Sequence, residues 1–314
     1  MANSEVSASL ETYLDALRHG GELVVRESDG AFWQAGPFRS FSRRPSFCLS
    51  PPSGEQLRRL LWKHCSPVAT YVCEPDAAHS PNAWLYLCSD PDYSLERLGS
   101  AARRDIRRAR RAFRFEFIDT PSLLKNGTQA FCDTRRRVGL SDGYPEVFQR
   151  QYARFGDNPA HKIVGVWAQD SLAAFAALVS VDDWVEIFPY AADDHLKGCP
   201  VNGLLDFILN YFLVEHRFRT VNYGLSSIEE ASSAAGLHAF KKKTGFDCIP
   251  VHRAFVFHPL IRPLVNRALL WIVRGFRRLW PGSPSVRKAA GIVAACLGDN
   301  PMPKDQETLR EDRP

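Results

Sequence analysis

The clearest alternation of apolar and polar positions lies in the stretch 162–257, and its centre is the run WVEIFPY at 184–190. β-Branched and aromatic residues in such a run favour a partly buried strand. Because successive side chains point to opposite faces of a strand, Glu186 and Tyr190 share one face. After a loop rich in glycine, proline and short polar residues, apolar residues recur at helical spacing over 204–216. The pattern predicts a strand, a loop and a helix.

The rest of this stretch adds elements on both sides. Residues 162–168 and 172–180 are apolar runs around a short polar break, which predicts a hairpin before the central strand. The helix is followed by a strand at 220–224, a helix over 236–246 and an alternating strand at 251–257. The predicted order is β-β-β-α-β-α-β. We expect an α/β (α+β) unit in which helices flank a mixed sheet.

Similar patterns occur before this unit. Two short apolar runs split by Ser28-Asp29-Gly30 predict a hairpin. The run 55–64 predicts a helix, and 70–74 and 83–89 predict two strands. A hairpin, a helix and strands in this order suggest a short first domain ahead of the main one.

An arginine-rich helix is predicted between Leu95 and Phe113, where apolar residues recur every three or four positions. Guanidinium groups make bidentate contacts with phosphates, so this helix is a candidate site for the phosphates of CoA, a nucleotide sugar or tRNA. The alternative interpretation is a solvated charged face, which is what most charge runs are. The candidate phosphate-binding residues are Arg103, Arg104, Arg107 and Arg108.

The stretch 264–280 mixes leucine, isoleucine, phenylalanine and tryptophan with arginine at amphipathic spacing. A helix of this kind can lie at the surface of an anionic membrane. The alternative is a helix docked on the protein's own core. The polar tail from Pro301 is expected to be disordered, and no run of 18 apolar residues predicts a transmembrane helix.

The composition agrees with the predicted elements and adds few constraints on function. The chain has 314 residues, of which 45% are hydrophobic and 24% charged, as in a soluble globular protein with one large or two ordinary domains. Its net charge of +5 permits an anionic partner without requiring one. The eight cysteines form no C-x-x-C pair, and the His and Cys spacing indicates no metal site. With no signal sequence at its start, the chain is expected to be cytoplasmic.

Four short motifs point to a known family. The segment 236–246 reads G-L-x-x-F-K…G-F and follows Asn-Tyr-Gly at 222–224, while 103–113 reads RRDIRRARRAF and 134–139 begins Thr-Arg-Arg. Together these motifs resemble the Fem-type (FemAB-like) branch of the GNAT acyltransferase superfamily. The resemblance implies a GNAT-like sheet and a chain built from two such halves.

That architecture gives three expected segments. Residues 1–120 would form an abbreviated first GNAT-like half that ends in the arginine-rich helix. Residues 121–259 would form the acyltransferase domain, and 260–314 a basic amphipathic helix with a polar tail. A short first half puts in doubt the substrate channel that Fem-type proteins share.

The resemblance also implies an activity, the transfer of an acyl or aminoacyl group to an amine acceptor such as a cell-envelope precursor. The donor would be acyl-CoA or aminoacyl-tRNA, and the protein can lie peripherally at the inner membrane surface. A plain acyl-CoA N-acetyltransferase is one alternative, and a non-catalytic basic module that binds RNA or anionic lipid is another. The sequence leaves the oligomeric state open and contains no G-x-S-x-G motif of a serine hydrolase.

Four residues are candidates for the chemistry. Glu186 is the predicted general base, because GNAT enzymes often carry a carboxylate on the corresponding strand. The alternative is a carboxylate on a solvent-facing surface or paired with arginine. Tyr190 or Tyr223 is predicted to protonate the leaving thiolate, although buried tyrosines are often core residues. Lys241 is predicted to neutralise a phosphate or to polarise a carbonyl.

The loop between the central strand and its helix is the expected site of the donor. GNAT enzymes that use CoA carry a Q/R-x-x-G-x-G/A loop whose N–H groups hold pyrophosphate. Here that position begins with His195 and ends with Pro200, which has no N–H to donate. This departure weakens the expectation of acetyl-CoA and is compatible with aminoacyl-tRNA or an acyl carrier. The candidate donor-binding residues are His195, Lys197, Gly198 and Asn202.

An acceptor groove is expected along the two helices that precede the hairpin. By the resemblance, its candidate substrate contacts are Arg135, Arg136 and Tyr144. Solvation at the protein surface is the alternative role for all three.

Overall fold

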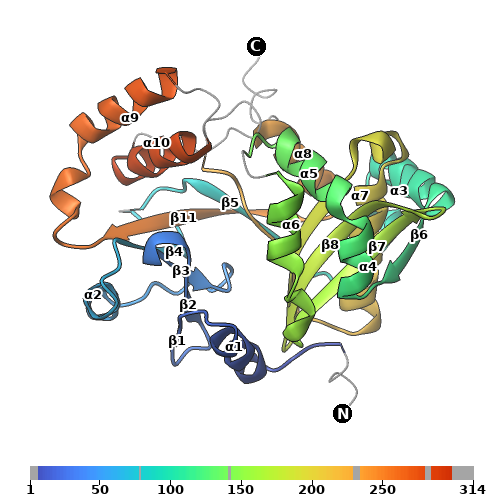
Figure 1. Ribbon diagram of the computed structural model, residues 1–314, viewed down its shortest axis with the longest axis horizontal. Helices are drawn as coiled ribbons and strands as arrows, with labels where there is room; N and C mark the ends of the chain where they lie inside the picture. The colour runs from blue at the N-terminus through green and yellow to red at the C-terminus, as the bar shows by residue number, and fades with distance from the viewer. Residues whose placement is uncertain (1–5, 78, 141–142, 229–233, 280–283, 299–314) are drawn as a thin grey trace. The chain divides into compact units, whose positions relative to one another are not determined.

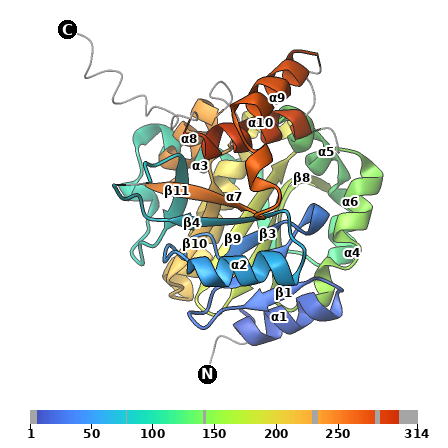
Figure 2. The same cartoon turned by 90° about the vertical axis from the view of Figure 1, so that its left-hand side faces the viewer.

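The computed structural model describes residues 6–77, 79–140, 143–228, 234–279 and 284–298. By its internal contacts the chain forms two compact units, whose helices and strands are labelled in Figures 1 and 2. Unit 1 comprises Met1–His19, Leu87–Gly224 and Phe240–Asp247, and unit 2 comprises Gly20–Tyr86, Leu225–Ala239 and Cys248–Pro314. These units interleave along the chain, so the three-segment division at 120 and 259 stays a prediction. The tail from Pro301 lies outside the described residues.

Unit 1 is built on a mixed sheet with the strand order β10-β9-β8-β7-β6. β10 lies parallel to β9, and the other neighbours are antiparallel. The predicted hairpin, central strand and following strand are therefore confirmed, as is the mixed sheet flanked by helices. The strands are β6 (Arg114–Phe117), β7 (His161–Ala168), β8 (Ser171–Val181), β9 (Trp184–Ala191) and β10 (Thr220–Leu225).

Helices cover both faces of this sheet. α7 packs on one face and carries α3 on its outer side, while α4, α5 and α6 cover the other face (Figure 1). The second face holds an aromatic core in which Phe131, Phe148, Tyr152 and Phe175 are fully buried. The helices are α1 (Leu10–His19), α3 (Ser100–Ala112), α4 (Thr120–Asn126), α5 (Thr128–Arg137), α6 (Pro145–Tyr152), α7 (Pro200–Leu209) and α8 (Ala234–Lys243), of which α8 begins in unit 2.

Two predicted helix boundaries were wrong. α7 begins at Pro200 and not at 204, because Cys199 turns the chain in the left-handed region (φ 59°) and proline at the first helical position has a suitable φ. It continues into a π-helix, Asn210–Glu215. The arginine-rich helix begins at Ser100 and not at Leu95, where a separate 3₁₀ turn forms. β6 follows it directly and was not predicted.

Unit 2 has the strand order β1-β2-β3-β4-β11-β5. α2 packs on this sheet through Leu57, Leu60 and Leu61, which contact Trp33 and Phe41. The predicted first hairpin and helix are confirmed, whereas β3 and α10 were not predicted. The elements are β1 (Val24–Arg26), β2 (Phe32–Ala35), β3 (Phe41–Arg44), α2 (Gly54–Lys63), β4 (Val68–Cys73), β5 (Ala83–Cys88), β11 (Asp247–Phe257), α9 (Arg267–Leu279) and α10 (Pro284–Cys296).

A glycine sets the distance between α3 and α7. A Cβ added at Gly203 would lie 2.7 Å from the Cβ of Ala109 and 2.5 Å from the ring of Phe115. We predict that Gly203→Ala lowers the free energy of unfolding by roughly 1–3 kcal/mol, because α3 must shift to admit the methyl group. Urea denaturation measures this change. Gly54→Ala, where an added Cβ meets nothing within 4 Å, is the matched control, and equal effects of the two changes would contradict the prediction.

Candidate active site

The sheet of unit 1 opens between β9 and β10. The two parallel strands pair over three positions, of which the last joins Glu186 to Asn222. Beyond this pair β9 stays paired with β8 as far as Ala191, while β10 turns away at Gly224, whose φ of +77° is in the left-handed region. We call the region beyond the last pair the β9–β10 opening. Ligands of open α/β sheets commonly bind where neighbouring strands part at their carboxyl ends.

Two polar side chains occupy the last paired position. Glu186 is only 7% exposed and Asn222 is fully buried. Both point to the face that α4, α5 and α6 cover, because partners in register share a face. Asn222 Oδ1 accepts a hydrogen bond of 2.9 Å from the backbone N–H of Gly224. The sequence pointed to Glu186 as a base but not to Asn222, although the Asn-Tyr-Gly motif at a strand end was the available signal.

Lys241 and Tyr223 meet at the end of β10. Lys241 is 4% exposed, and its Nζ donates a 3.0 Å hydrogen bond to the backbone carbonyl of Tyr223. The same Nζ lies 4.2 Å from the centre of the Tyr223 ring, a cation–π distance. Burial raises the pKa of the Tyr223 hydroxyl, so it stays protonated at neutral pH. A fixed cation therefore stands at the carboxyl end of β10.

The four candidate catalytic residues do not form a single cluster. Asn222 and Tyr223 are successive residues of one strand, so their side chains point to opposite faces of the sheet. Glu186 and Tyr190 accordingly face α4–α6, whereas the ring of Tyr223 and Lys241 lie on the other face. The residues of the two faces can therefore act on one ligand only if that ligand lies at the β9–β10 opening, between the two faces.

Tyr190 has the surroundings of a core residue. Its ring stacks on Phe175 with the centroids 4.8 Å apart and also contacts Phe131. Burial and a hydrogen bond with Tyr190 raise the pKa of the Tyr152 hydroxyl. This tyrosine pair keeps both hydroxyls within the aromatic core, which supports the alternative that the sequence left open for Tyr190.

The loop between β9 and α7 uses several of its own N–H groups. The N–H of Cys199 donates to the carbonyl of Leu196, and those of Asn202 and Gly203 donate to the carbonyl of Cys199. Pro200 has none to donate. Fewer backbone N–H groups of this loop are therefore available to hold a pyrophosphate.

The candidate donor residues in this loop have structural contacts. Gly198 passes so close to Phe113 that an added Cβ would lie 2.5 Å from its ring. The ring of His195 meets the same phenylalanine edge-on at 6.2 Å. The carbonyl of Lys197 accepts a 3.2 Å hydrogen bond from Arg108 Nη1. Asn202 is buried within the first turn of α7. Donor binding by these four residues stays a prediction.

Some arginines of α3 hold the helix in place. Arg110 donates two hydrogen bonds, of 3.0 and 2.7 Å, to Oδ2 of Asp206, a carboxylate of α7 that is 2% exposed. On another side of α3, Asp105 accepts from Lys243 Nζ at 2.5 Å. This bond lowers the pKa of the Asp105 carboxyl despite its partial burial. α3 is thus fixed by ion pairs on two sides and by buried alanine and isoleucine between them.

Other arginines of α3 form an outward stripe. Arg103, Arg107 and Arg111 are spaced by four residues, so they lie above one another on one face with Arg104 beside them. Together with Ser100 these four arginines line a surface depression of about 330 Å³. Among the described residues, no carboxylate lies within ion-pair distance of Arg103, Arg107 or Arg111. Three of the predicted phosphate-binding residues are therefore brought together, and Arg111 joins them in place of Arg108.

The candidate acceptor residues lie at the end of α5 and the start of α6. The guanidinium of Arg135 stacks over the ring of Phe131 at 5.1 Å. Arg136 pairs with Asp133 at 2.9 Å, and Tyr144 is 61% exposed. Arg137, which the sequence did not single out, donates to the carbonyl of Ala191 at 3.0 Å and so ties α5 to the end of β9. Acceptor binding at these positions stays a prediction.

Two kinds of feature are absent from the described part of the chain. No group of three or more His, Cys, Asp or Glu side chains there could hold a metal ion. No described helix has both the length and the apolar character to cross a membrane.

No protein-family model matches the sequence, and no curated protein does either. Among solved structures, FemX matches with 13% identity and a TM-score of 0.54, over 80% of this chain and 92% of FemX. The C-terminal domain of a protein described as a lysylphosphatidylglycerol synthetase from Agrobacterium fabrum matches with 17% identity and a TM-score of 0.51, over 79% of this chain and 91% of that domain.

A third structure, L-PGS from Bacillus licheniformis, matches with 14% identity and a TM-score of 0.50, over 81% of this chain and 93% of its own. At such low identity these likenesses show the fold alone. The likeness to FemX confirms that the chain has the fold expected of a Fem-type protein.

The Arg110–Asp206 pair gives a prediction about pH. Burial raises the pKa of the Asp206 carboxyl above its ordinary value, while the hydrogen bonds from Arg110 act against this rise. In Arg110→Gln the pKa of the Asp206 carboxyl should rise further. Below this raised pKa the folded variant keeps a proton on Asp206 that the unfolded chain has released. We expect the variant to lose roughly 1–2 kcal/mol of stability at pH 7, and less as the pH falls toward about 5.

Urea denaturation at both pH values measures this difference. Arg107→Gln, which changes an outward arginine of the same helix, should leave stability nearly unchanged at each pH. A loss in Arg110→Gln that does not depend on pH would contradict a role for the carboxyl of Asp206.

Proposed function

We propose that this protein transfers an acyl or aminoacyl group from a phosphate-bearing donor to an amine at the β9–β10 opening. One observation carries the proposal: a buried carboxylate, Glu186, occupies the last paired position before two parallel strands part, in a chain with a GNAT-type fold. Acyl transfer to an amine needs a base that accepts the amine proton, and a group that stabilises the charge of the tetrahedral intermediate.

Glu186 is the proposed base. The neighbouring amide of Asn222 is held by the N–H of Gly224, so it keeps its position at the last pair. Lys241 is the proposed positioning cation, because it fixes the carbonyl of Tyr223 at the end of β10. The proton of the amine would go to Glu186, the new C–N bond would form at the donor carbonyl, and the donor's oxygen or sulfur would leave.

The donor is proposed to be aminoacyl-tRNA rather than acyl-CoA. The loop before α7 uses several of its N–H groups in its own hydrogen bonds, whereas the four arginines that line the depression on α3 offer guanidinium groups over a length of helix. Like charges four residues apart repel one another and destabilise a helix, and a bound polyanion would remove this repulsion. A nucleic-acid backbone supplies phosphates in a row. Two of the solved structures with this fold are named for lysylphosphatidylglycerol synthesis or as L-PGS, and an aminoacyl product is consistent with this choice.

The base role predicts a selective loss of turnover. Glu186→Gln keeps the size and hydrogen-bonding atoms of the side chain but removes its basicity. We expect the rate of transfer to an amine to fall by roughly 10²–10⁴-fold, with the melting temperature little changed. A transfer assay with labelled aminoacyl-tRNA or acetyl-CoA and a set of amines measures it. Asp183→Asn, an exposed carboxylate beside the same strand, is the control, and equal rates for the two variants would refute the base assignment.

The donor proposal predicts a change in salt dependence. Arg107→Gln combined with Arg111→Gln should weaken binding of bulk tRNA and reduce the slope of log K against log salt by about 1.5, because two phosphate contacts are lost. Filter binding over a range of salt concentrations measures the slope. Arg150→Gln with Arg154→Gln removes the same charge from another surface of unit 1 and should leave the slope unchanged.

These measurements also separate the alternatives. A salt-resistant rise in melting temperature with acetyl-CoA and none with tRNA would favour a plain N-acetyltransferase. Binding of tRNA that depends on Arg107 and Arg111, with no transfer in the wild type, would favour a basic binding module on a retained fold.

A further inference from the structure

The end of unit 2 exposes an unusual combination of side chains. α9 packs on α10 through Leu269 and Leu270, which contact Val293 and Ala294, and the two helices lie against each other in both views (Figures 1 and 2). The opposite side of α9 is not covered by α10. There Trp271 is 79% and Leu279 is 71% exposed, which is unusual for such large apolar residues.

Basic and apolar residues occupy adjacent sectors of this exposed side. At about 100° per residue, Arg267, Arg274 and Arg278 project close together, and Trp271 borders them. The next sector holds Ile272 and Leu279, both exposed. Arginines beside a tryptophan, followed by an apolar sector, are typical of helices that lie in the plane of a membrane interface.

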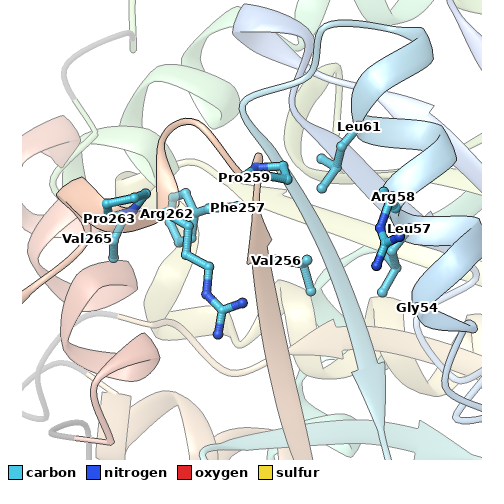
Figure 3. Close-up of a pocket in the computed structure, with 10 residues that line it drawn as sticks. All are labelled: Gly54, Leu57, Arg58, Leu61, Val256, Phe257, Pro259, Arg262, Pro263 and Val265. Atoms are coloured by element: carbon cyan, nitrogen blue, oxygen red, sulfur yellow. The ribbon is translucent and has the colours of Figure 1, made fainter.

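The turn before α9 also exposes large apolar side chains. Leu260 and Leu264 are 72% and 65% exposed, and Arg262 lies between them in the sequence. Arg262 and Val265 also line a pocket of about 680 Å³ whose apolar wall includes Leu57 of α2. Figure 3 shows Arg58 and Arg262 reaching this pocket from opposite sides, with Val256 between them.

The charge of the segment identifies the partner. Between Leu260 and Gly298 the sequence contains no acidic residue. Its basic residues are Arg262, Arg267, Arg274, Arg277, Arg278, Arg287 and Lys288. A nucleic acid would match this charge but would leave the exposed leucines and tryptophan in water, and a second copy of the chain would bring like charges together. An anionic lipid surface can both neutralise the basic residues and bury the exposed apolar side chains.

We propose that unit 2 docks on an anionic lipid bilayer through this surface, which consists of Leu260, Arg262, Leu264 and the exposed side of α9. α9 has 13 residues, about 20 Å in length, so it lies along the membrane and does not span it. The pocket between Arg58 and Arg262 adjoins the surface and has the chemistry to receive the phosphate and upper acyl chain of one lipid. Docking of this kind does not require the proposed transfer activity.

Vesicle co-sedimentation of the full chain tests the proposal. We expect binding to vesicles of phosphatidylcholine with about one third phosphatidylserine, and little binding to phosphatidylcholine alone. Arg274→Gln with Arg278→Gln should weaken binding about 25-fold, because each arginine near an anionic surface contributes about one factor of five. Trp271→Ser with Leu279→Ser should weaken it at least about tenfold.

Matched controls exclude general effects of charge and exposed apolar area. Arg59→Gln with Lys63→Gln removes two charges from α2, and Phe38→Ser removes an aromatic ring that is 93% exposed. Both should bind as the wild type does. Circular dichroism of each variant confirms folding, and all the changed residues are exposed.

Three outcomes would overturn the proposal. The first is equal binding to neutral and anionic vesicles, and the second is wild-type binding by both α9 variants. The third is a dimer in solution that Trp271→Ser with Leu279→Ser converts to a monomer, which would make this surface an interface between two copies. Because no transfer is measured, failure of the proposed activity leaves this test unaffected.

Discussion

The structure depends on the parting of two parallel strands. When β10 leaves β9 after the Glu186–Asn222 pair, backbone groups lose the strand partner that a continuous sheet would supply. Buried backbone groups need other partners. Asn222 Oδ1 accepts from the N–H of Gly224, and Lys241 Nζ donates to the carbonyl of Tyr223. The side chains that make the opening possible therefore also give it a fixed amide and a fixed cation.

In α3, the arginines of a single helix likewise have two different roles. Arg110 reaches the buried carboxylate of Asp206, and Arg108 holds the loop before α7. Arg103, Arg107 and Arg111 make no such contacts with the described carboxylates. The sequence alone cannot separate these roles, because a run of arginines that faces solvent has the same composition as a run that binds a ligand. Only the fold shows which arginines are already used.

This explains how far the sequence could predict the fold and the site. Alternation and helical spacing gave the order of elements from 162 to 257, because one buried face imposes a strict period. They missed the start of α7, which depends on the left-handed conformation of Cys199. Glu186 stood out as a carboxylate on an apolar strand, and the Asn-Tyr-Gly motif marked Asn222, but the position of Asn222 beside Glu186 follows only from the register of the two strands. Long-range pairing is not encoded locally, so Arg110–Asp206 and Lys241–Tyr223 could not be predicted.

The basic surfaces of α3 and α9 differ in one respect that decides which partner each can bind. No large apolar side chain is exposed among the described residues of α3, so its stripe offers charge and hydrogen bonds alone. α9 presents Trp271 and Leu279 beside its arginines, and water solvates that combination poorly. A phosphate backbone satisfies the first surface without burying apolar area. The second surface gains from a partner only if charge and apolar area are covered together, as at the boundary between lipid headgroups and acyl chains.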